Sequence, residues 1–135
     1  RVDRRQRQMC IRDSFMCGSM ERNGIVPDAF RESVFLREGY SSTVFFRTFA
    51  VPHAMNFLAY ETKIAVLIPS TPINWETSDV SLVLLLAINE GDYDDFVRFY
   101  QPLISVLYDR ELFTELRSMS SYHEFMKFLD KQISM

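Results

Sequence analysis

The chain has 135 residues, of which 47% are hydrophobic and 24% are charged, and these values fit one globular domain rather than a disordered segment. The formal net charge of −3 provides no overall positive field for nucleic acid. The longest apolar run, residues 80–88, is interrupted only by Ser81 and is too short to cross a bilayer, which takes about 20 residues.

The N-terminal residues 1–14, RVDRRQRQMCIRDS, are rich in arginine and lack apolar periodicity. One interpretation is a basic arm for nucleic acid. We favour a foreign or disordered segment, because QRQMCIRDS resembles a translated sequencing adapter; residues 15–135 are then a single domain without its natural N-terminus. No secretory signal is visible, and Cys10 and Cys17 have no metal-type spacing with a histidine, so we expect a reduced, cytoplasmic protein.

Two helices are predicted before the first strand. Residues 26–39, VPDAFRESVFLREG, predict a helix with Gly39 just past its end and an apolar face that includes Phe35. Residues 14–24 predict a shorter helix that stops at Asn23-Gly24.

The middle of the chain is predicted to be extended. Residues 41–51, SSTVFFRTFAV, are rich in Thr, Val and Phe, and residues 62–70, TKIAVLIPS, form a second such run. Residues 70–79 are predicted to be a loop. Residues 80–89, VSLVLLLAIN, lack the alternation of a half-exposed strand and therefore predict a strand covered on both faces, followed by a turn.

Three helices are predicted after the strands, over residues 92–109, 110–119 and 120–133. Pro102 should kink or break the first of them, and Ser121 should cap the third. Helices before and after a group of strands predict an α/β fold, a three-layer sandwich in which a central mixed sheet has helices on both faces.

His53 follows Pro52 at the end of the predicted strand, in the stretch FAVPHAMN. Because proline stops the strand, the ring should lie at a turn and face solvent, where a neutral imidazole is available as a nucleophile. A packed or surface histidine without chemistry is the alternative. The sequence has no GxSxG motif or glycine-rich phosphate loop, and His53 and His123 show no metal-ligand spacing, so no cofactor or metal is expected.

Three stretches in order, REGYSSTVFFRTFAVPHA, TKIAVLIPSTPINW and VSLVLLLAI, resemble the type-2 IIA domain of the bacterial phosphoenolpyruvate-dependent sugar phosphotransferase system. The resemblance implies that His53 is the phosphorylated histidine, that Arg37 steadies the phosphoryl group, and that Ser42 and Thr43 shape the pocket. Without it, Arg37 would be a solvated charge at a helix end, and the two hydroxyl residues would simply start the strand.

One departure from this family concerns a second histidine. Sugar-transporting members often carry it near the start of the helix after the long apolar strand, where this chain has GDYDDFVRFY. The C-terminal stretches DDFVRFYQPLISVLYD and SSYHEFMKFL are more similar to the IIA-like domain that ends PRD-containing transcription regulators and antiterminators of the BglG/MtlR/LicR type.

This closer resemblance implies a regulatory module that is phosphorylated by HPr or IIB proteins. Nucleic acid would be bound only by upstream domains absent from this sequence, and no membrane insertion is expected. The alternative left open is a transport phosphocarrier that passes phosphate from HPr to a IIB component during sugar uptake.

Overall fold

The computed structural model describes residues 16–134 with the exception of residues 41, 42, 46, 47, 55, 76 and 77. The segment 1–14 and the candidate pocket residue Ser42 therefore lie outside the described residues. The chain divides into two compact units, Arg1–Asp92 and Tyr93–Met135. A single domain over residues 15–135 stays a prediction.

The described part of the first unit begins with a short helix over residues 16–22. Gly24 has a φ of 71°. The Gly24 N–H donates to the Glu21 carbonyl (3.1 Å), and the Ile25 N–H donates to the Met20 carbonyl (3.0 Å). This pair of bonds around a left-handed glycine is a Schellman motif, so the predicted helix stop is confirmed.

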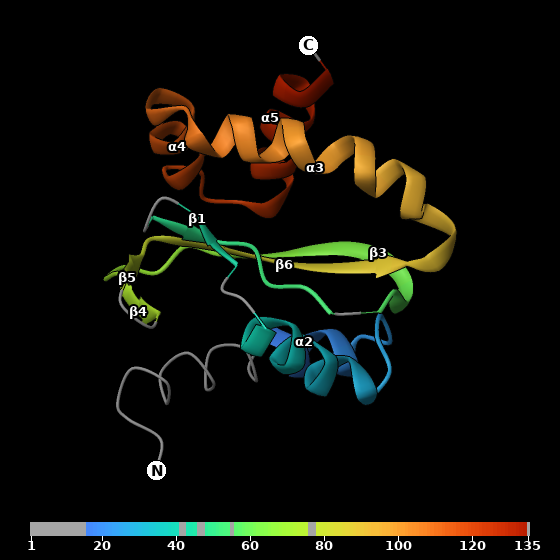
Figure 1. Cartoon of the computed structure of the whole chain (residues 1–135). Helices are drawn as coiled ribbons and strands as arrows, with labels where there is room; N and C mark the ends of the chain where they lie inside the picture. Colours follow the sequence, from blue (N-terminus) through green and yellow to red (C-terminus); the bar gives the residue numbers. More distant parts are fainter. Residues whose placement is uncertain (1–15, 41–42, 46–47, 55, 76–77, 135) are drawn as a thin grey trace. The chain divides into compact units, whose positions relative to one another are not determined.

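Helix α2, Ala29–Tyr40, lies against one face of the sheet of the first unit (Figure 1). Phe30 and Val34 are fully buried in the core. Phe35 was predicted on the same apolar face but is only half-buried. Gly39 was predicted just past the helix end, but it lies inside α2, because it does not adopt the positive φ with which a glycine ends a helix.

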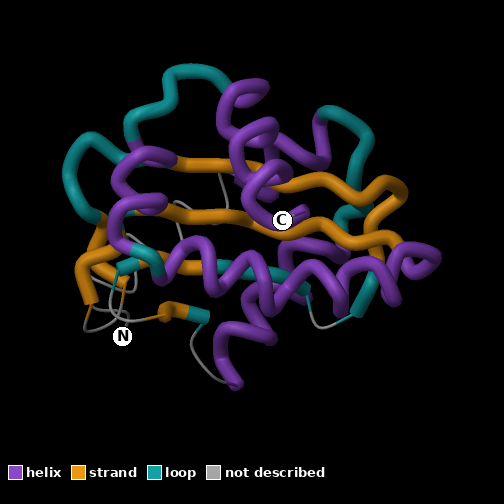
Figure 2. The backbone as a smooth tube through the Cα atoms, turned by 90° about the horizontal axis from the view of Figure 1, so that it is seen from above, coloured by secondary structure: helices purple, strands orange, loops and turns teal. Residues whose placement is uncertain are grey.

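Four strands of the first unit form a mixed sheet in the order β1-β2-β6-β3. β1 (Val44–Phe45) is antiparallel to β2 (Phe49–Ala50), β2 is parallel to β6 (Leu82–Asn89), and β6 is antiparallel to β3 (Leu58–Leu67). Figure 2 shows the long strands running side by side. The predicted α/β class with a mixed sheet is confirmed.

Two predictions about strands were wrong in detail. Residues 41–51 were expected to be one extended segment, but they contain the β1–β2 hairpin. Residues 70–79 were expected to be a loop, but β4 (Ile73–Trp75) pairs there with β5 (Ser78–Val80) in a second antiparallel hairpin. Strands this short depend on their pairing partner, and local composition carries little signal for them.

β6 is the most buried strand of the sheet. Its residues Val83, Leu85 and Ala87 belong to the core cluster that also contains α2. Successive side chains of a strand point to opposite faces, and Leu84 and Leu86 on the other face are buried as well. The predicted strand with both faces covered is confirmed.

A 3₁₀ turn, η1 (Glu90–Asp92), ends the first unit and matches the predicted turn. The second unit contains three helices, α3 (Tyr93–Tyr108), α4 (Arg110–Arg117) and α5 (Tyr122–Ser134), which contact one another.

The boundaries of these helices lie close to the predicted ones. α3 continues through Pro102 without a break, since a proline removes one hydrogen bond and the rest of the helix is retained. The Glu124 N–H donates to Ser121 Oγ (3.1 Å), which confirms the predicted N-cap of α5.

Candidate functional site

His53 is held by the backbone of the central strand. β2 is parallel to β6 with Ala50 opposite Val83, and His53 lies opposite Leu86 in the same register, as an isolated bridge. The Leu86 N–H donates to the Pro52 carbonyl (3.0 Å). Pro52 has no N–H of its own, so it interrupts the ladder and ends β2 while its carbonyl still keeps the segment in register.

Nδ1 of the His53 ring contacts the backbone. Nδ1 lies 3.0 Å from the Val51 carbonyl oxygen. A carbonyl oxygen only accepts hydrogen bonds, so in this contact Nδ1 carries the proton and donates. In the neutral ring the lone pair is then on Nε2, the nitrogen suited to nucleophilic attack.

The ring of His53 is half-buried, and its surroundings lower its pKa below the ordinary value of 6.5. Burial is the largest cause, because removal from water disfavours the imidazolium form. The hydrogen bond to Val51 raises the pKa, the positive charge of Arg37 lowers it, and the negative charge of Glu38 raises it. The net effect keeps His53 neutral, and therefore nucleophilic, at neutral pH.

Arg37 and Glu38 occupy the last turn of α2. Glu38 follows Phe30 and Val34 at four-residue spacing, so all three lie on the helix face that is buried. Arg37 is half-buried, and its charge reaches His53 strongly enough to affect its pKa. The face of α2 that packs on the sheet thus brings two opposite charges to the histidine.

The Glu38 side chain is fixed by burial and by hydrogen bonds. Its side chain is only 6% exposed, and both carboxylate oxygens accept hydrogen bonds from Thr43. The Thr43 hydroxyl donates to Oε1, and the Thr43 N–H donates to Oε2 (3.3 Å). The Thr43 carbonyl in turn accepts from the Val51 N–H (3.1 Å).

The predicted site residues therefore separate into two groups. Arg37, Thr43 and His53 come together in the first unit, around the end of β2. Ser42 lies outside the described residues. Glu38 was not predicted as a site residue, although a charged residue that continues an apolar stripe at helical spacing was a signal for a buried partner.

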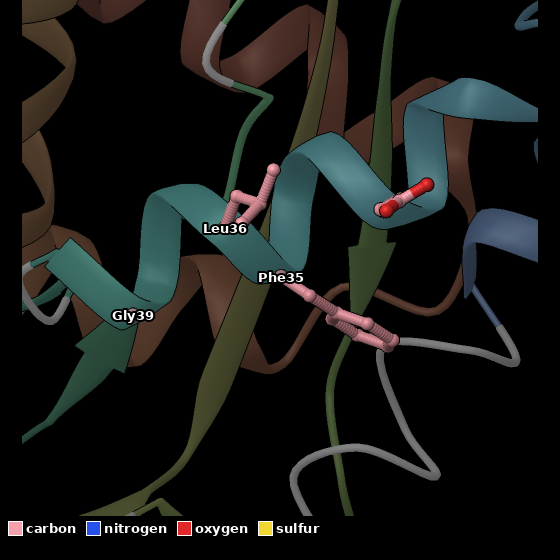
Figure 3. Close-up of a pocket in the computed structure, with 4 residues that line it drawn as sticks. Phe35, Leu36 and Gly39 are labelled. Carbon is pink, nitrogen blue, oxygen red and sulfur yellow. The ribbon is translucent and has the colours of Figure 1, made fainter.

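Two hollows lie near these elements. One, of about 300 Å³, is lined by Asn56, Phe57, Leu58 and Glu90, shortly after His53 in the chain. The other, of about 400 Å³, runs along the side of α2 that carries Phe35 and Leu36 (Figure 3). The described residues that line the second hollow are Glu32, Phe35, Leu36 and Gly39, and they do not include Glu38, Thr43 or His53.

The described residues form neither a metal-binding cluster nor a membrane-spanning helix. Within residues 16–134, apart from the seven omitted positions, no three His, Cys, Asp or Glu side chains are grouped so that they could hold a metal ion. None of the helices described there is long and apolar enough to span a membrane.

Comparison with known protein families gives a match over nearly the whole chain. Residues 14–132 match the family described as "Phosphoenolpyruvate-dependent sugar phosphotransferase system, EIIA 2". A curated relative, the "Probable licABCH operon regulator" of Bacillus subtilis strain 168, is 30% identical over 110 residues. These residues are 82% of this chain but 17% of that regulator, so the chain spans a small part of its relative.

Solved structures with the same fold include the mannitol IIA of Escherichia coli. Its crystal structure has a TM-score of 0.71 and 17% identity, and the match covers 90% of this chain and 89% of that one. The Escherichia coli complex of mannitol IIA with phosphorylated mannitol IIB gives a TM-score of 0.70 at 17% identity, over 90% and 87% of the two chains. At this identity the likeness shows a shared fold alone.

Proposed function

The chain belongs to the EIIA type 2 family of the phosphoenolpyruvate-dependent sugar phosphotransferase system, and from this premise we propose that it is a phosphoacceptor domain, reversibly phosphorylated on His53. One observation carries the proposal. His53 is held in register on β6 with Nδ1 engaged by Val51, and this leaves Nε2 as the nucleophile.

The reaction is a phosphoryl transfer between two imidazoles. The Nε2 lone pair of His53 attacks the phosphorus of a phosphohistidine on the donor protein, a new P–N bond forms, and the P–N bond of the donor breaks. The electron pair of the broken bond stays on the donor ring, which leaves as imidazole. Nδ1 of His53 keeps its proton throughout, bound to the Val51 carbonyl.

Arg37 supplies the positive charge for the incoming group. A guanidinium is always charged and donates two parallel hydrogen bonds to phosphate oxygens. Its charge already acts on the ring of His53 in the unphosphorylated protein. Thr43 contributes indirectly by holding the backbone of the site through its bonds to Glu38 and Val51.

The regulatory role is favoured by the curated relative. That protein is described as an operon regulator, and this chain matches only 17% of its length, as expected of one module within a larger protein. Phosphorylation adds nearly two negative charges, which is enough to reorganise a contact between domains. HPr and IIB proteins are the expected donors, in the cytoplasm, and any nucleic acid would be bound by other domains of a longer protein.

The transport role remains the second candidate. It is favoured by the structural likeness to mannitol IIA, which was solved in complex with phosphorylated mannitol IIB. In this role the domain would pass the phosphoryl group from HPr to a IIB component during sugar uptake.

The assignment of His53 is tested by phosphorylation of the purified chain with labelled phosphoenolpyruvate, enzyme I and HPr. We expect an acid-labile, base-stable label on the wild type and none on His53→Ala, because that change removes the attacking nitrogen. His123→Ala is the matched control, since His123 is the other of two histidines and is exposed on α5. Label that persists in His53→Ala would refute the assignment.

The same assay separates the two roles when candidate IIB proteins are added. Onward transfer of the label to IIB would favour the transport phosphocarrier. Retention of the label, together with a phosphorylation-dependent change in the activity of the longer protein, would favour the regulatory module.

A further inference from the structure

Glu38 is in an unfavourable place for a carboxylate. It lies in the last turn of α2, where the helix dipole disfavours negative charge, and it is 6% exposed. Burial of an ionised carboxylate is costly unless hydrogen bonds compensate for the lost water. The position therefore calls for an explanation beyond packing.

Both oxygens of the Glu38 carboxylate accept hydrogen bonds from Thr43. Thr43, itself 2% exposed, donates its hydroxyl to Glu38 Oε1 and its N–H to Oε2. Thr43 directly precedes β1, so this contact ties the end of α2 to the start of the sheet. Because both oxygens of one carboxylate are bound, the contact fixes the orientation of Thr43 relative to the Glu38 side chain as well as the distance between them.

From Thr43 the contacts continue to the histidine. The Thr43 carbonyl accepts from the Val51 N–H, and the Val51 carbonyl accepts from His53 Nδ1. The bonds to Glu38 hold Thr43, the bond from Val51 to Thr43 holds Val51, and the Val51 carbonyl then holds the His53 ring. The series runs from the Glu38 carboxylate to the imidazole ring without a solvent-exposed link, as Thr43 and Val51 are buried and His53 is half-buried.

Resting on the proposed function, we propose that Glu38 is a positioning residue for phosphoryl transfer, which acts through Thr43 and Val51 to fix the His53 ring in the tautomer with the proton on Nδ1. Glu38 also matters for charge. When Nε2 takes the phosphoryl group and Nδ1 keeps its proton, the ring becomes positively charged, and the buried carboxylate stabilises that charge while Arg37 attracts the phosphate oxygens.

The test is Glu38→Gln, which keeps the size and an acceptor oxygen but removes the charge. We expect phosphorylation of His53 by phospho-HPr to slow about ten-fold and the pKa of His53 to fall further, because the carboxylate raises it. Glu32→Gln is the matched control, since Glu32 is an exposed glutamate of the same helix that lines a hollow in which Glu38 has no part. This control should match the wild type in both measurements.

The pKa and the tautomer of His53 are measured by NMR of the imidazole nitrogens, which is simple in a chain with two histidines. Among the described residues, the charged groups that shift this pKa are Arg37 and Glu38, both from α2. A structural role alone would lower the stability of the fold without moving either quantity in the folded protein.

Thr43 provides a second pair of variants if Glu38→Gln fails to fold. Thr43→Ser keeps the hydroxyl that donates to Glu38 and should phosphorylate at close to the wild-type rate. Thr43→Val removes the hydroxyl at nearly constant volume and should slow phosphorylation several-fold, with a mixture of His53 tautomers.

The inference is overturned if folded Glu38→Gln, or folded Thr43→Val, shows the wild-type rate, pKa and tautomer. Failure of the proposed function looks different, because the wild type itself would then take no phosphate. In that case the NMR titration still decides whether Glu38 controls the ring: an unchanged pKa and tautomer would overturn the inference, and a lowered pKa would support it.

Discussion

Arg37 and Glu38 are neighbours in the sequence but act on the His53 ring with opposite sign. Arg37 lowers the pKa of His53 and Glu38 raises it, while burial has the largest effect and lowers it. Because the effects of the two charges on the pKa have opposite sign, burial determines the direction of the shift, and the ring stays neutral at neutral pH. In the proposed function, the positive charge would attract the incoming phosphoryl group and the negative charge would stabilise the ring that accepts it.

At this residue scale, replacement of Arg37 is expected to change the basicity of the His53 ring and the rate of phosphate acceptance in opposite directions. In Arg37→Ala the pKa of His53 should rise, because the nearby positive charge is removed. Acceptance of phosphate should nevertheless slow at least about ten-fold, because the phosphate oxygens lose their guanidinium partner. The measurements are an NMR titration and the rate of labelling by phospho-HPr.

Arg98→Ala serves as the control for this change, since Arg98 is an exposed arginine on α3. If Arg37→Ala matches the wild type in both measurements, Arg37 is a solvated charge at a helix end and has no part in the site.

At the scale of one element, α2 reverses the usual amphipathic pattern near its C-terminus. Leu36 is 54% exposed, whereas the charged residue Glu38 is 6% exposed. The helix face that packs on the sheet also brings Arg37 and Glu38 close enough to His53 to affect its pKa. A sequence pattern that looks weakly amphipathic can therefore mark a functional helix.

The two glycines around α2 should respond in opposite ways to the same substitution. Gly24→Ala should destabilise the protein by about 1 kcal/mol, because Gly24 has a φ of 71°, which an L-residue resists. Gly39→Ala should stabilise it by up to about 1 kcal/mol, because Gly39 is inside α2 and alanine favours the helix.

Chemical denaturation of the two variants measures these changes. At both positions a new Cβ would meet no atom within 4 Å, so a steric clash contributes to neither result. Changes of the same sign in the two variants would contradict the assigned backbone conformations.

At the scale of the whole molecule, the lowered pKa of His53 couples the site to the stability of the fold. The unfolded chain binds a proton at the ordinary pKa of 6.5, whereas the folded protein binds it only at lower pH. The unfolded state therefore gains protons first as the pH falls, and the free energy of unfolding decreases. The contribution of neutral His53 is fully present above pH 6.5 and is lost as the pH falls through the folded pKa.

His53→Gln should remove this dependence, because glutamine does not titrate and its amide can still donate to Val51. Between pH 7.5 and 5, the wild type should lose stability relative to the variant with a slope of at most about 1.4 kcal/mol per pH unit. Denaturation curves at several pH values measure the difference. Parallel pH profiles of the two proteins would show that burial of His53 does not oppose its protonation.

Much of this protein follows from local patterns in its sequence. The apolar run of residues 80–88 predicted a strand with both faces covered, Asn23-Gly24 ended a helix, and Ser121 began another. The proline before His53 ended β2 because it has no N–H to donate. Each of these signals depends on residues that are neighbours in the chain, so each element could be predicted from the sequence alone.

The tertiary structure alone decided which distant residues meet. Nothing local indicated that residues 41–51 would turn back as a hairpin, because strands of two residues exist only through their partners. The path from Glu38 through Thr43 and Val51 to His53 depends on that hairpin and on the register of β2 with β6. Hydrogen bonds acting across the fold, rather than composition, determine which ring nitrogen carries the proton.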